Sequence, residues 1–319
     1  MRLVFMGTPQ FAVPTLERLV TAGHSVLLIL TQPDRPKGRG GHPASSPVKE
    51  AALRLGLPLH QPERVRRPEV VELLRALETD AMVVVGYGQI IPQSVIDLPR
   101  HGIINVHASL LPKYRGAAPI QWAVANGEAI TGVTTMRINA GLDTGDMLMK
   151  YETAIGPGED ALQLGARLSV AGADLLVKTL DALESGALTP IQQDDAEATY
   201  APILKKEDGR IDWTLLAPAI VNRARGFLPW PGAWTWFRDQ RLHIWKACVA
   251  SSGEGACGAL TVEGRHLLVQ CGANTRLELM EVQQEGRKRM NAEAFLNGMQ
   301  VGQFRRAAPG ENDILGRKS

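Results

Sequence analysis

The feature of the sequence that most constrains the fold is an uninterrupted run of five apolar residues, Ala81 to Val85. Such a run is typical of a strand buried on both faces at the centre of a parallel sheet. Leu3 to Met6 and Val26 to Leu30 have the same character, and an amphipathic helix is predicted between them over Val13 to Ala22. The order strand, helix, strand predicts a right-handed βαβ unit and therefore an α/β fold.

Periodicity predicts the further elements of the first half of the chain. Helices are expected over residues 48–55, 68–77, 120–126 and 161–185, and strands over 57–59, 131–138 and 147–151. A further strand is expected to start at Ile103 and to be ended by Leu110-Leu111-Pro112. The turn after the first strand, Gly7-Thr8-Pro9, has one glycine and no GxGxxG pattern. A dinucleotide site is therefore not expected there.

The segment Ile103 to Pro112 combines a predicted buried strand with two polar side chains. Asn105 and His107 are two residues apart, so on a strand they point to the same face. Ligands of parallel α/β sheets usually bind at such strand ends. An amide beside an imidazole could hold a carbonyl oxygen and move a proton. A buried, satisfied histidine beside a strand-ending asparagine explains the same residues, and the segment alone leaves both interpretations open.

Three loops carry further candidate groups. Thr31 to Pro47 is rich in Pro and Gly and holds Arg35, Lys37 and Arg39, which suits either phosphate contact or a solvated loop. Residues 86–92 contain two glycines that either let backbone approach a flat ligand or form a plain turn. In residues 139–146, Asp143 could orient the His107 ring or be an ordinary turn residue.

The 319 residues suggest two domains. We predict a first domain over 1–187, a linker over 188–205 and a second domain over 206–319. Short strands at 234–237, 242–249, 258–262, 267–270 and 277–282 predict a small antiparallel barrel. The aromatic residues between Phe227 and Phe237 are expected in its core rather than stacked on bases.

Charge and cysteine content add little about partners. The net charge is +2, and the positive excess lies after residue 205. The cluster Arg287, Lys288 and Arg289 suits either phosphate contact or a solvated turn. Three cysteines without CxxC spacing indicate neither a disulfide framework nor a zinc site. With no signal peptide and no long apolar run evident, we expect a cytoplasmic protein that does not bind membranes.

The motifs together resemble one family. Asn105-x-His107, Ser109-Leu110-Leu111-Pro112, Arg115-Gly116 and Gly141-Leu142-Asp143-Thr144-Gly145, in this order, are similar to formyltransferases that use 10-formyltetrahydrofolate. The basic loop, the sequence Arg115 to Ile120 and the second domain resemble the branch of that family that acts on methionyl-tRNA. The resemblance implies a Rossmann-like catalytic domain followed by an OB-like β-barrel domain that binds tRNA.

The resemblance also implies roles for individual residues. Asn105 donates to the formyl oxygen, His107 stabilises charge or transfers a proton, and Asp143 orients the ring and helps to deprotonate the attacking amine. Folate would lie against residues Ser109, Leu110, Leu111 and Pro112 and against the backbone of Gly86, Tyr87, Gly88, Gln89 and Ile90. The tRNA would contact Arg35, Lys37, Arg39, Arg287, Lys288 and Arg289, with Arg39 the main candidate. No metal is required, and a monomer is expected.

Two departures from the family pattern affect these expectations. Ala108 replaces the usual glycine and narrows the site slightly, and Gly41-His42 replaces residues that are often lysines, which weakens the charge of the loop. The alternatives are a folate-dependent formyltransferase or hydrolase that acts on a small molecule, and a tRNA-binding protein with an inactive first domain. The intact Asn105, His107 and Asp143 argue against the inactive protein.

Overall fold

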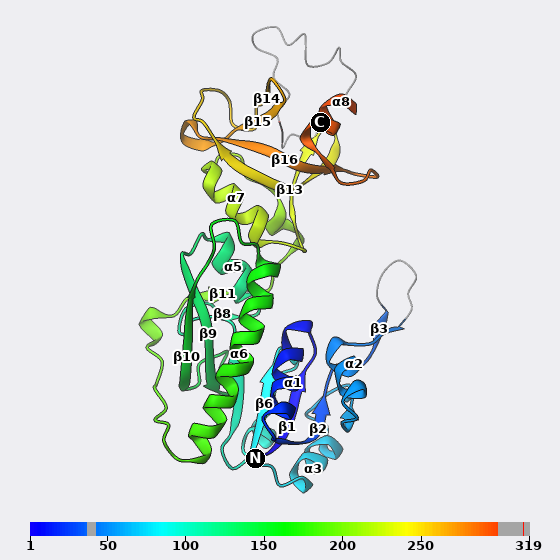
Figure 1. Ribbon diagram of the computed structural model, residues 1–319, viewed down its shortest axis with the longest axis vertical. Helices are drawn as coiled ribbons and strands as arrows, with labels where there is room; N and C mark the ends of the chain where they lie inside the picture. Colours follow the sequence, from blue (N-terminus) through cyan, green and yellow to red (C-terminus); the bar gives the residue numbers. More distant parts are fainter. Residues whose placement is uncertain (37–42, 299–314, 316–319) are drawn as a thin grey trace. The chain divides into compact units, whose positions relative to one another are not determined.

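The computed structural model describes residues 1–36, 43–298 and 315, in two compact units (Figure 1). The first unit contains Met1–Pro119, Ile130–Ala154 and Leu164–Pro202. The second contains Ile120–Ala129, Ile155–Gln163 and the described residues from Ile203 onward. No helix in the described ranges has the length and apolar character needed to cross a membrane.

The first unit is built on one seven-stranded sheet of order β10-β9-β7-β6-β1-β2-β5. Its strands are β1 (Arg2–Gly7), β2 (Ser25–Leu30), β5 (Leu59–His60), β6 (Ala81–Val85), β7 (Ile103–His107), β9 (Ile130–Arg137) and β10 (Met147–Ala154). Five neighbouring strands of this sheet are parallel to one another, namely β7, β6, β1, β2 and β5, which confirms the predicted α/β sheet. β9 pairs in antiparallel register with both of its neighbours, β7 and β10, so the sheet is mixed rather than wholly parallel.

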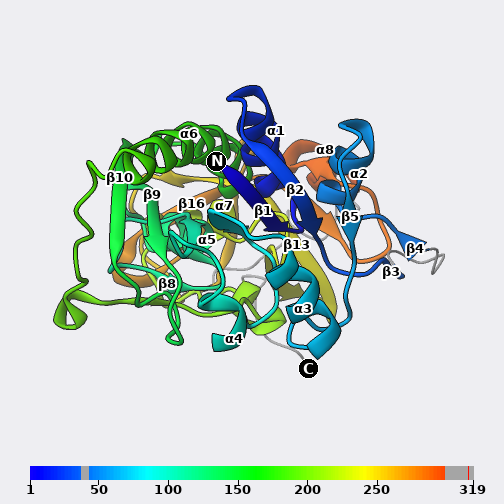
Figure 2. The ribbon, with the colours of Figure 1, turned by 90° about the horizontal axis from the view of Figure 1, so that it is seen from below.

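Helices cover both faces of this sheet. Figure 2 shows α1 (Val13–Thr21) and α6 (Ala161–Glu184) on one face, and α3 (Pro68–Ala76) and α4 (Gln93–Ile96) on the other. α2 (Pro47–Arg54) packs against α1. Gly172 allows α6 to approach the sheet, because an added Cβ there would lie 2.9 Å from Val106 Cγ1. The closely packed faces hold β7, and with it Asn105 and His107, in a fixed position.

The basic loop contains a two-stranded hairpin that its sequence did not predict. β3 (Arg35–Pro36) pairs with β4 (Pro43–Ala44) in antiparallel register. Both strands have only two residues, so the pairing is compatible with the prolines that exclude an inner strand. Lys37 and Arg39 lie outside the described residues.

The predicted linker over 188–205 is largely built into the first unit. β11 (Tyr200–Ala201) pairs in parallel with β8 (Arg115–Gly116), and Ile191 forms a bridge to Met147. A short 3₁₀ helix, η2 (Asp195–Glu197), lies between these contacts. Backbone pairing and the buried side chain of Gln193 hold the segment, and neither feature gives a periodic apolar pattern. The sequence therefore suggested a linker where the fold has a packed strap.

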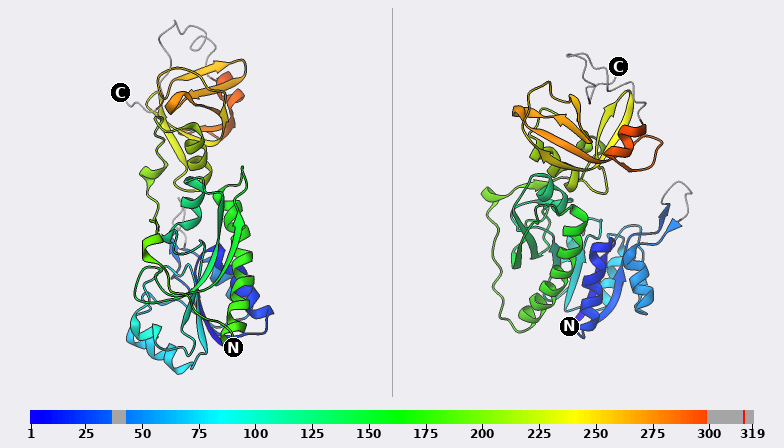
Figure 3. Two further views of the ribbon diagram at one scale, coloured as in Figure 1. Left: turned by 90° about the vertical axis from the view of Figure 1, so that its left-hand side faces the viewer. Right: turned by 45° about the horizontal axis from the view of Figure 1, so that its top comes forward.

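The second unit contains a six-stranded antiparallel sheet (Figure 3), which confirms the predicted antiparallel strands, whereas the OB-like barrel stays a prediction. Its strands are β12 (Ala233–Phe237), β13 (Gln240–Ala250), β14 (Leu260–Glu263), β15 (His266–Gln270), β16 (Arg276–Gln284) and β17 (Met290–Asn291). Its helices are α5 (Pro119–Ala125, from Ile120), α7 (Ala217–Gly226), α8 (Ala292–Gly298) and the short 3₁₀ turns η3 (Lys206–Gly209) and η4 (Gly272–Asn274).

The aromatic segment of the second unit has a divided role. Phe227, Trp234 and Phe237 are buried, as expected for core residues. The rings of Phe227 and Trp122 of α5 meet edge to face with centroids 5.3 Å apart. Trp230, however, has 54% of its surface exposed, so the prediction that the segment lies in the core is wrong for this residue.

Candidate active site

The end of β7 places the two leading candidates at the edge of the sheet. Ile103 and Ile104 are buried, and the strand ends at His107. Asn105 is partly exposed, and its side chain makes no hydrogen bond to the described part of the chain. His107 is 5% exposed. The arrangement leaves an amide donor available to a ligand beside a ring that is held by the protein.

The His107 ring has one committed nitrogen and one available nitrogen. Nε2 lies 2.9 Å from the carbonyl oxygen of Tyr114. A carbonyl only accepts hydrogen bonds, so Nε2 carries the proton and donates it. In the neutral ring Nδ1 is then an acceptor, and it lies 3.8 Å from Asp143 Oδ2. His107 Nδ1 and Asp143 Oδ2 are then two acceptors that face each other. The contact between them becomes favourable when a proton is delivered to Nδ1.

Asp143 is held by contacts from outside its own loop. Its Oδ2 accepts a 2.8 Å hydrogen bond from the backbone N–H of Gly116. Asp143 has φ +52°, a left-handed conformation that is uncommon for residues other than glycine. Gly116 has φ +117°, and an added Cβ would lie 2.7 Å from the Ala201 carbonyl oxygen, so this position requires glycine. The predicted approach of Asp143 to His107 is present in the geometry.

A buried glutamine ties this loop to the strap at residues 188–202. Gln193 Nε2 donates to the carbonyl oxygens of Asp143 and Gly145, each at 2.7 Å. Its Oε1 accepts a 2.9 Å bond from Nε of Arg115, which is 2% exposed. The Arg115 guanidinium also pairs with Asp195 at 2.8 Å. This network fixes the backbone on both sides of Thr144 and with it the position of the Asp143 carboxylate.

Sequence reasoning did not identify Gln193 or assign a role to the Arg115 side chain. Both lie in segments without apolar periodicity, and one was expected to be a linker. The only local signal is that Arg115 lies within the Arg115-Gly116 motif of the family resemblance. A side chain with five donors that becomes buried requires partners, but the sequence does not say which residues supply them.

The segment predicted to hold folate is firmly anchored. The Ser109 hydroxyl donates to the Lys113 carbonyl at 2.6 Å, and the Ser109 carbonyl accepts from Thr134 at 2.7 Å. Leu111 is fully buried and donates its N–H to the Thr134 hydroxyl at 3.2 Å. Leu110 is partly exposed, and Pro112 follows a cis peptide bond. The segment therefore offers a rigid backbone rather than mobile side chains.

The predicted pterin-side segment divides into scaffold and surface. Tyr87 is 1% exposed and packs in the core, and burial raises its pKa to about 12. Gln89 is bonded to Val65 N–H and to the Pro62 carbonyl. By contrast, Gly86 and Gly88 are exposed with positive φ, and Ile90 is 94% exposed. Backbone and Ile90, rather than the Tyr87 or Gln89 side chains, are available to a ligand here.

The candidate tRNA contacts fall into different situations. Arg35 is exposed on β3, whereas Lys37 and Arg39 are not among the described residues. Arg287 and Lys288 are exposed and make no ion pair within the described ranges. Arg289 pairs with Glu281 at 2.5 Å and lies over the Trp245 ring, 5.0 Å from its centroid. The described residues also contain no cluster of three or more His, Cys, Asp or Glu suited to a metal.

Comparison with known proteins connects this site to a family. Residues 1–180 match the model described as formyl transferase, and residues 203–300 match the formyl transferase C-terminal domain. Methionyl-tRNA formyltransferase from Solibacter usitatus is 65% identical over 301 residues, which cover 94% of this chain and 96% of that protein. The Koribacter versatilis protein of the same name is 57% identical over 321 residues and the full length of both chains.

Solved structures agree on the fold. The sugar 3N-formyltransferase WlaRD, determined with dTDP and 5-N-formyl-THF, matches with a TM-score of 0.66 at 17% identity, covering 90% of this chain and 99% of that one. HypX from Aquifex aeolicus in complex with tetrahydrofolic acid matches with a TM-score of 0.63 at 16% identity, and the match covers 95% of this chain and 48% of HypX. With both domains matched and full-length relatives at this identity, the chain belongs to the methionyl-tRNA formyltransferase family.

Proposed function

We propose that the chain transfers the formyl group of 10-formyltetrahydrofolate to the α-amino group of initiator methionyl-tRNA. The observation that carries this proposal is the similarity to methionyl-tRNA formyltransferases across both units of the chain. The product, formylmethionyl-tRNA, starts translation. We place the activity in the cytoplasm, where charged tRNA is used, and propose that the enzyme acts as a monomer.

The choice of donor rests on the binding segment and on relatives. Structural neighbours carry folate-type molecules, namely 5-N-formyl-THF in WlaRD and tetrahydrofolic acid in HypX. In this chain the rigid turn Ser109 to Pro112 and the exposed backbone of Gly86 and Gly88 offer a flat ligand close approach. The pterin would lie against these segments, with Ile90 as an apolar contact.

The proposed reaction begins when the α-amine of methionyl-tRNA attacks the formyl carbon. A C–N bond forms, and negative charge develops on the formyl oxygen. The available amide of Asn105 donates to this oxygen. The amine proton passes to Nδ1 of His107, the nitrogen not committed to Tyr114, and the Asp143 carboxylate stabilises the resulting imidazolium. The bond from the formyl carbon to the folate nitrogen then breaks, and that nitrogen takes the proton.

The tRNA is proposed to be held through its phosphates. Arg35, Lys37 and Arg39 of the first unit would contact the acceptor end, with Arg39 the main candidate. In the second unit Arg287 and Lys288 are better placed for phosphate than Arg289, because Arg289 already pairs with Glu281. Phosphate contacts of this kind make binding fall steeply with salt.

The test is formyl transfer from 10-formyltetrahydrofolate to initiator methionyl-tRNA, run beside elongator methionyl-tRNA and free methionine. We expect strong preference for the initiator tRNA and loss of its affinity as salt increases. Asp143→Asn, assayed in parallel, shows whether the observed product comes from this site. Formate release without dependence on an acceptor would instead establish a hydrolase, and formylation of a small amine at least as fast as of tRNA would establish a small-molecule enzyme.

A further inference from the structure

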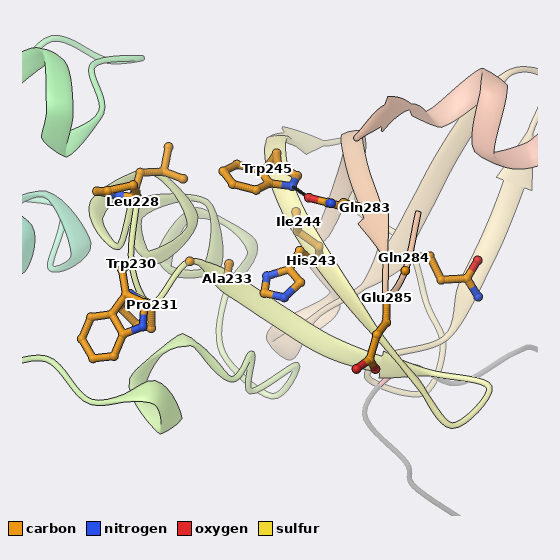
Figure 4. A pocket seen from close by; sticks show the side chains of 13 residues that line it. Leu228, Trp230, Pro231, Ala233, His243, Ile244, Trp245, Gln283, Gln284 and Glu285 are labelled. Atoms are coloured by element: carbon orange, nitrogen blue, oxygen red, sulfur yellow. Dashed lines mark hydrogen bonds between the residues drawn. The ribbon is translucent and has the colours of Figure 1, made fainter. Parts of the chain in front are cut away.

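The second unit contains a cavity of about 340 Å³ that none of the roles above uses. Its wall is formed by β13 and the end of β16, and the loop between α7 and β12 forms its other side (Figure 4). The residues that line it include Trp230, Pro231, His243, Trp245, Gln283 and Glu285. Its volume is at the lower end of the range of about 300–1,000 Å³ found for small-ligand pockets.

The cavity lies on the face of β13 that the core does not use. Leu242 and Ile244 are 0% and 2% exposed and belong to the core cluster of the unit. Because side chains alternate along a strand, the His243 and Trp245 rings project from the opposite face. Figure 4 shows both rings on this wall, with Trp230 across from them on the loop. The cavity therefore lies between this face of the strand and the loop, and Ala233 and Ile244 of the core cluster also line it.

Its walls offer flat aromatic surfaces in fixed positions. The Trp245 indole N–H donates to Gln283 Oε1 at 3.0 Å, which fixes the ring, and Arg289 covers one of its two faces. Trp230 is 54% exposed at the edge of the cavity, an unusual position for a large aromatic residue. Aromatic rings that line a cavity suit a planar ligand that can stack.

Polar groups that could hold the edge of such a ligand are also present. The His243 ring makes no hydrogen bond to the described part of the chain. Burial, together with the charge of Arg241, lowers the pKa of His243, although Glu285 acts in the opposite direction. The ring is thus neutral at pH 7 and has one donor and one acceptor. The Glu285 carboxylate is exposed beside it.

Basic residues follow directly after the last residue that lines the cavity. Gly286 lines the cavity, and Arg287, Lys288 and Arg289 follow it directly. The Arg289 guanidinium lies over the same Trp245 ring, with 5.0 Å to the centroid. A ligand that suits both features has a planar, hydrogen-bonding part joined to an anionic part.

We propose that this cavity binds one unstacked base of the substrate tRNA while Arg287 and Lys288 contact the adjoining phosphates. The proposal rests on the proposed function for the identity of the nucleic acid, but the nucleotide site itself does not depend on it. The cavity makes the second unit a reader of an exposed base in addition to a source of phosphate contacts. It contributes to affinity for tRNA and leaves the formyl-transfer step unchanged.

The first test measures kcat and KM for initiator methionyl-tRNA with the full-length double variant Trp230→Leu/His243→Leu. We expect KM to rise about fivefold or more with kcat unchanged, since stacking on one aromatic residue is worth about 1–3 kcal/mol. The single variant Trp230→Phe, which keeps an aromatic ring and the native His243, should keep most of the affinity for tRNA. His266→Leu is the matched control, because His266 lies on β15, is 64% exposed and does not line the cavity.

The second test probes the tRNA bases chemically with dimethyl sulfate. Wild-type enzyme and His266→Leu should protect the same unpaired base, and the double variant should restore its reactivity. An unchanged KM and an unchanged protection pattern, in a double variant with wild-type near-ultraviolet circular dichroism and melting temperature, would overturn the proposal.

The third test separates the cavity from the proposed function. Nucleoside monophosphates (AMP, GMP, CMP and UMP) are titrated into the full-length chain while the His243 ring signals are followed by NMR, assigned with His243→Leu. Shifts of these signals that saturate support the nucleotide site even if the wild-type enzyme does not formylate methionyl-tRNA. Saturating shifts with 5-formyltetrahydrofolate and none with the nucleotides would overturn it in favour of a folate site.

Discussion

Replacing Gln193 should impair the active site, although Gln193 lies in a segment to which no catalytic group is assigned. In Gln193→Leu the carbonyl oxygens of Asp143 and Gly145 lose their 2.7 Å donors, and Arg115 Nε loses its acceptor. A net hydrogen bond is worth about 0.5–1.5 kcal/mol, and leaving a buried donor unpaired costs about 1–3 kcal/mol. Arg115 keeps Asp195, so we expect a loss of about 2–4 kcal/mol in the free energy of unfolding.

The effect on catalysis should exceed what reduced stability explains. The Asp143 loop would lose its attachment to the strap, and a displacement of about 1 Å in a reacting group can cost about 10²-fold in rate. We expect kcat for formyl transfer to fall about 10- to 100-fold at a temperature where the variant is fully folded. KM for folate should change little, because the Ser109 segment makes none of these contacts.

Two further variants make the experiment decisive. Gln193→Glu keeps an acceptor for Arg115 but loses both donors and turns a carboxylate oxygen toward the carbonyl oxygens of Asp143 and Gly145, so it should lose kcat even though the pair with Arg115 is kept. Gln192→Leu is the matched control, because Gln192 is exposed and makes no hydrogen bond within the described ranges. Urea unfolding and steady-state kinetics are measured on all three. A Gln193→Leu enzyme with reduced stability and normal kcat would show that Gln193 supports only the fold.

Four other changes test the remaining parts of the site and scaffold. Asp143→Asn should keep the melting temperature and lower kcat about 10²-fold or more, since the amide cannot stabilise protonated His107; near-normal turnover would remove Asp143 from the mechanism. Asn105→Ala should lower kcat about 10²- to 10³-fold, and a defect confined to KM would contradict a role at the formyl oxygen. Arg39→Ala should raise KM for methionyl-tRNA, and an unchanged rate at limiting tRNA would make the basic loop a bystander. Tyr87→Phe should reduce the loss of stability between pH 10 and 12. The phenol of the unfolded chain ionises near pH 10, whereas burial raises the pKa of Tyr87 in the folded chain to about 12. The contribution of the neutral phenol to stability is therefore fully present below pH 10 and is lost as pH rises through 12. Equal pH dependence of urea unfolding in wild type and Tyr87→Phe would refute that assignment.

The order and type of the elements followed from the sequence because their patterns are strong. Ala81 to Val85 is buried along its whole length and forms the β6 strand that was predicted. The directions of β9 and β10 could not be predicted in the same way. The β-branched, alternating residues of β9 predict a strand, and β9 is buried from Thr131 to Met136, but alternation is the same for parallel and antiparallel pairing.

The candidate site could be predicted only as far as local geometry reaches. Asn105 and His107 share a face because residues two apart on a strand point to the same side of the sheet. Which atom of His107 is available is not a local property, since it depends on the Tyr114 carbonyl seven residues later. The tautomer, and therefore the nitrogen that receives the proton, is determined by a loop that follows the strand.

The position of Asp143 is determined at still longer range. Its side chain is bonded to Gly116, 27 residues earlier, and its carbonyl to Gln193, 50 residues later. Gln193 is in turn bonded to Arg115, 78 residues before it. Polar contacts of this kind leave no period in the sequence, and a polar, aperiodic segment has the same composition whether it is a linker or a buried strap. Asp143, with φ +52°, keeps its carboxylate beside His107 because these distant donors hold it, so substitutions in the strap should lower turnover about 10- to 100-fold, less than replacement of Asp143 or Asn105 itself.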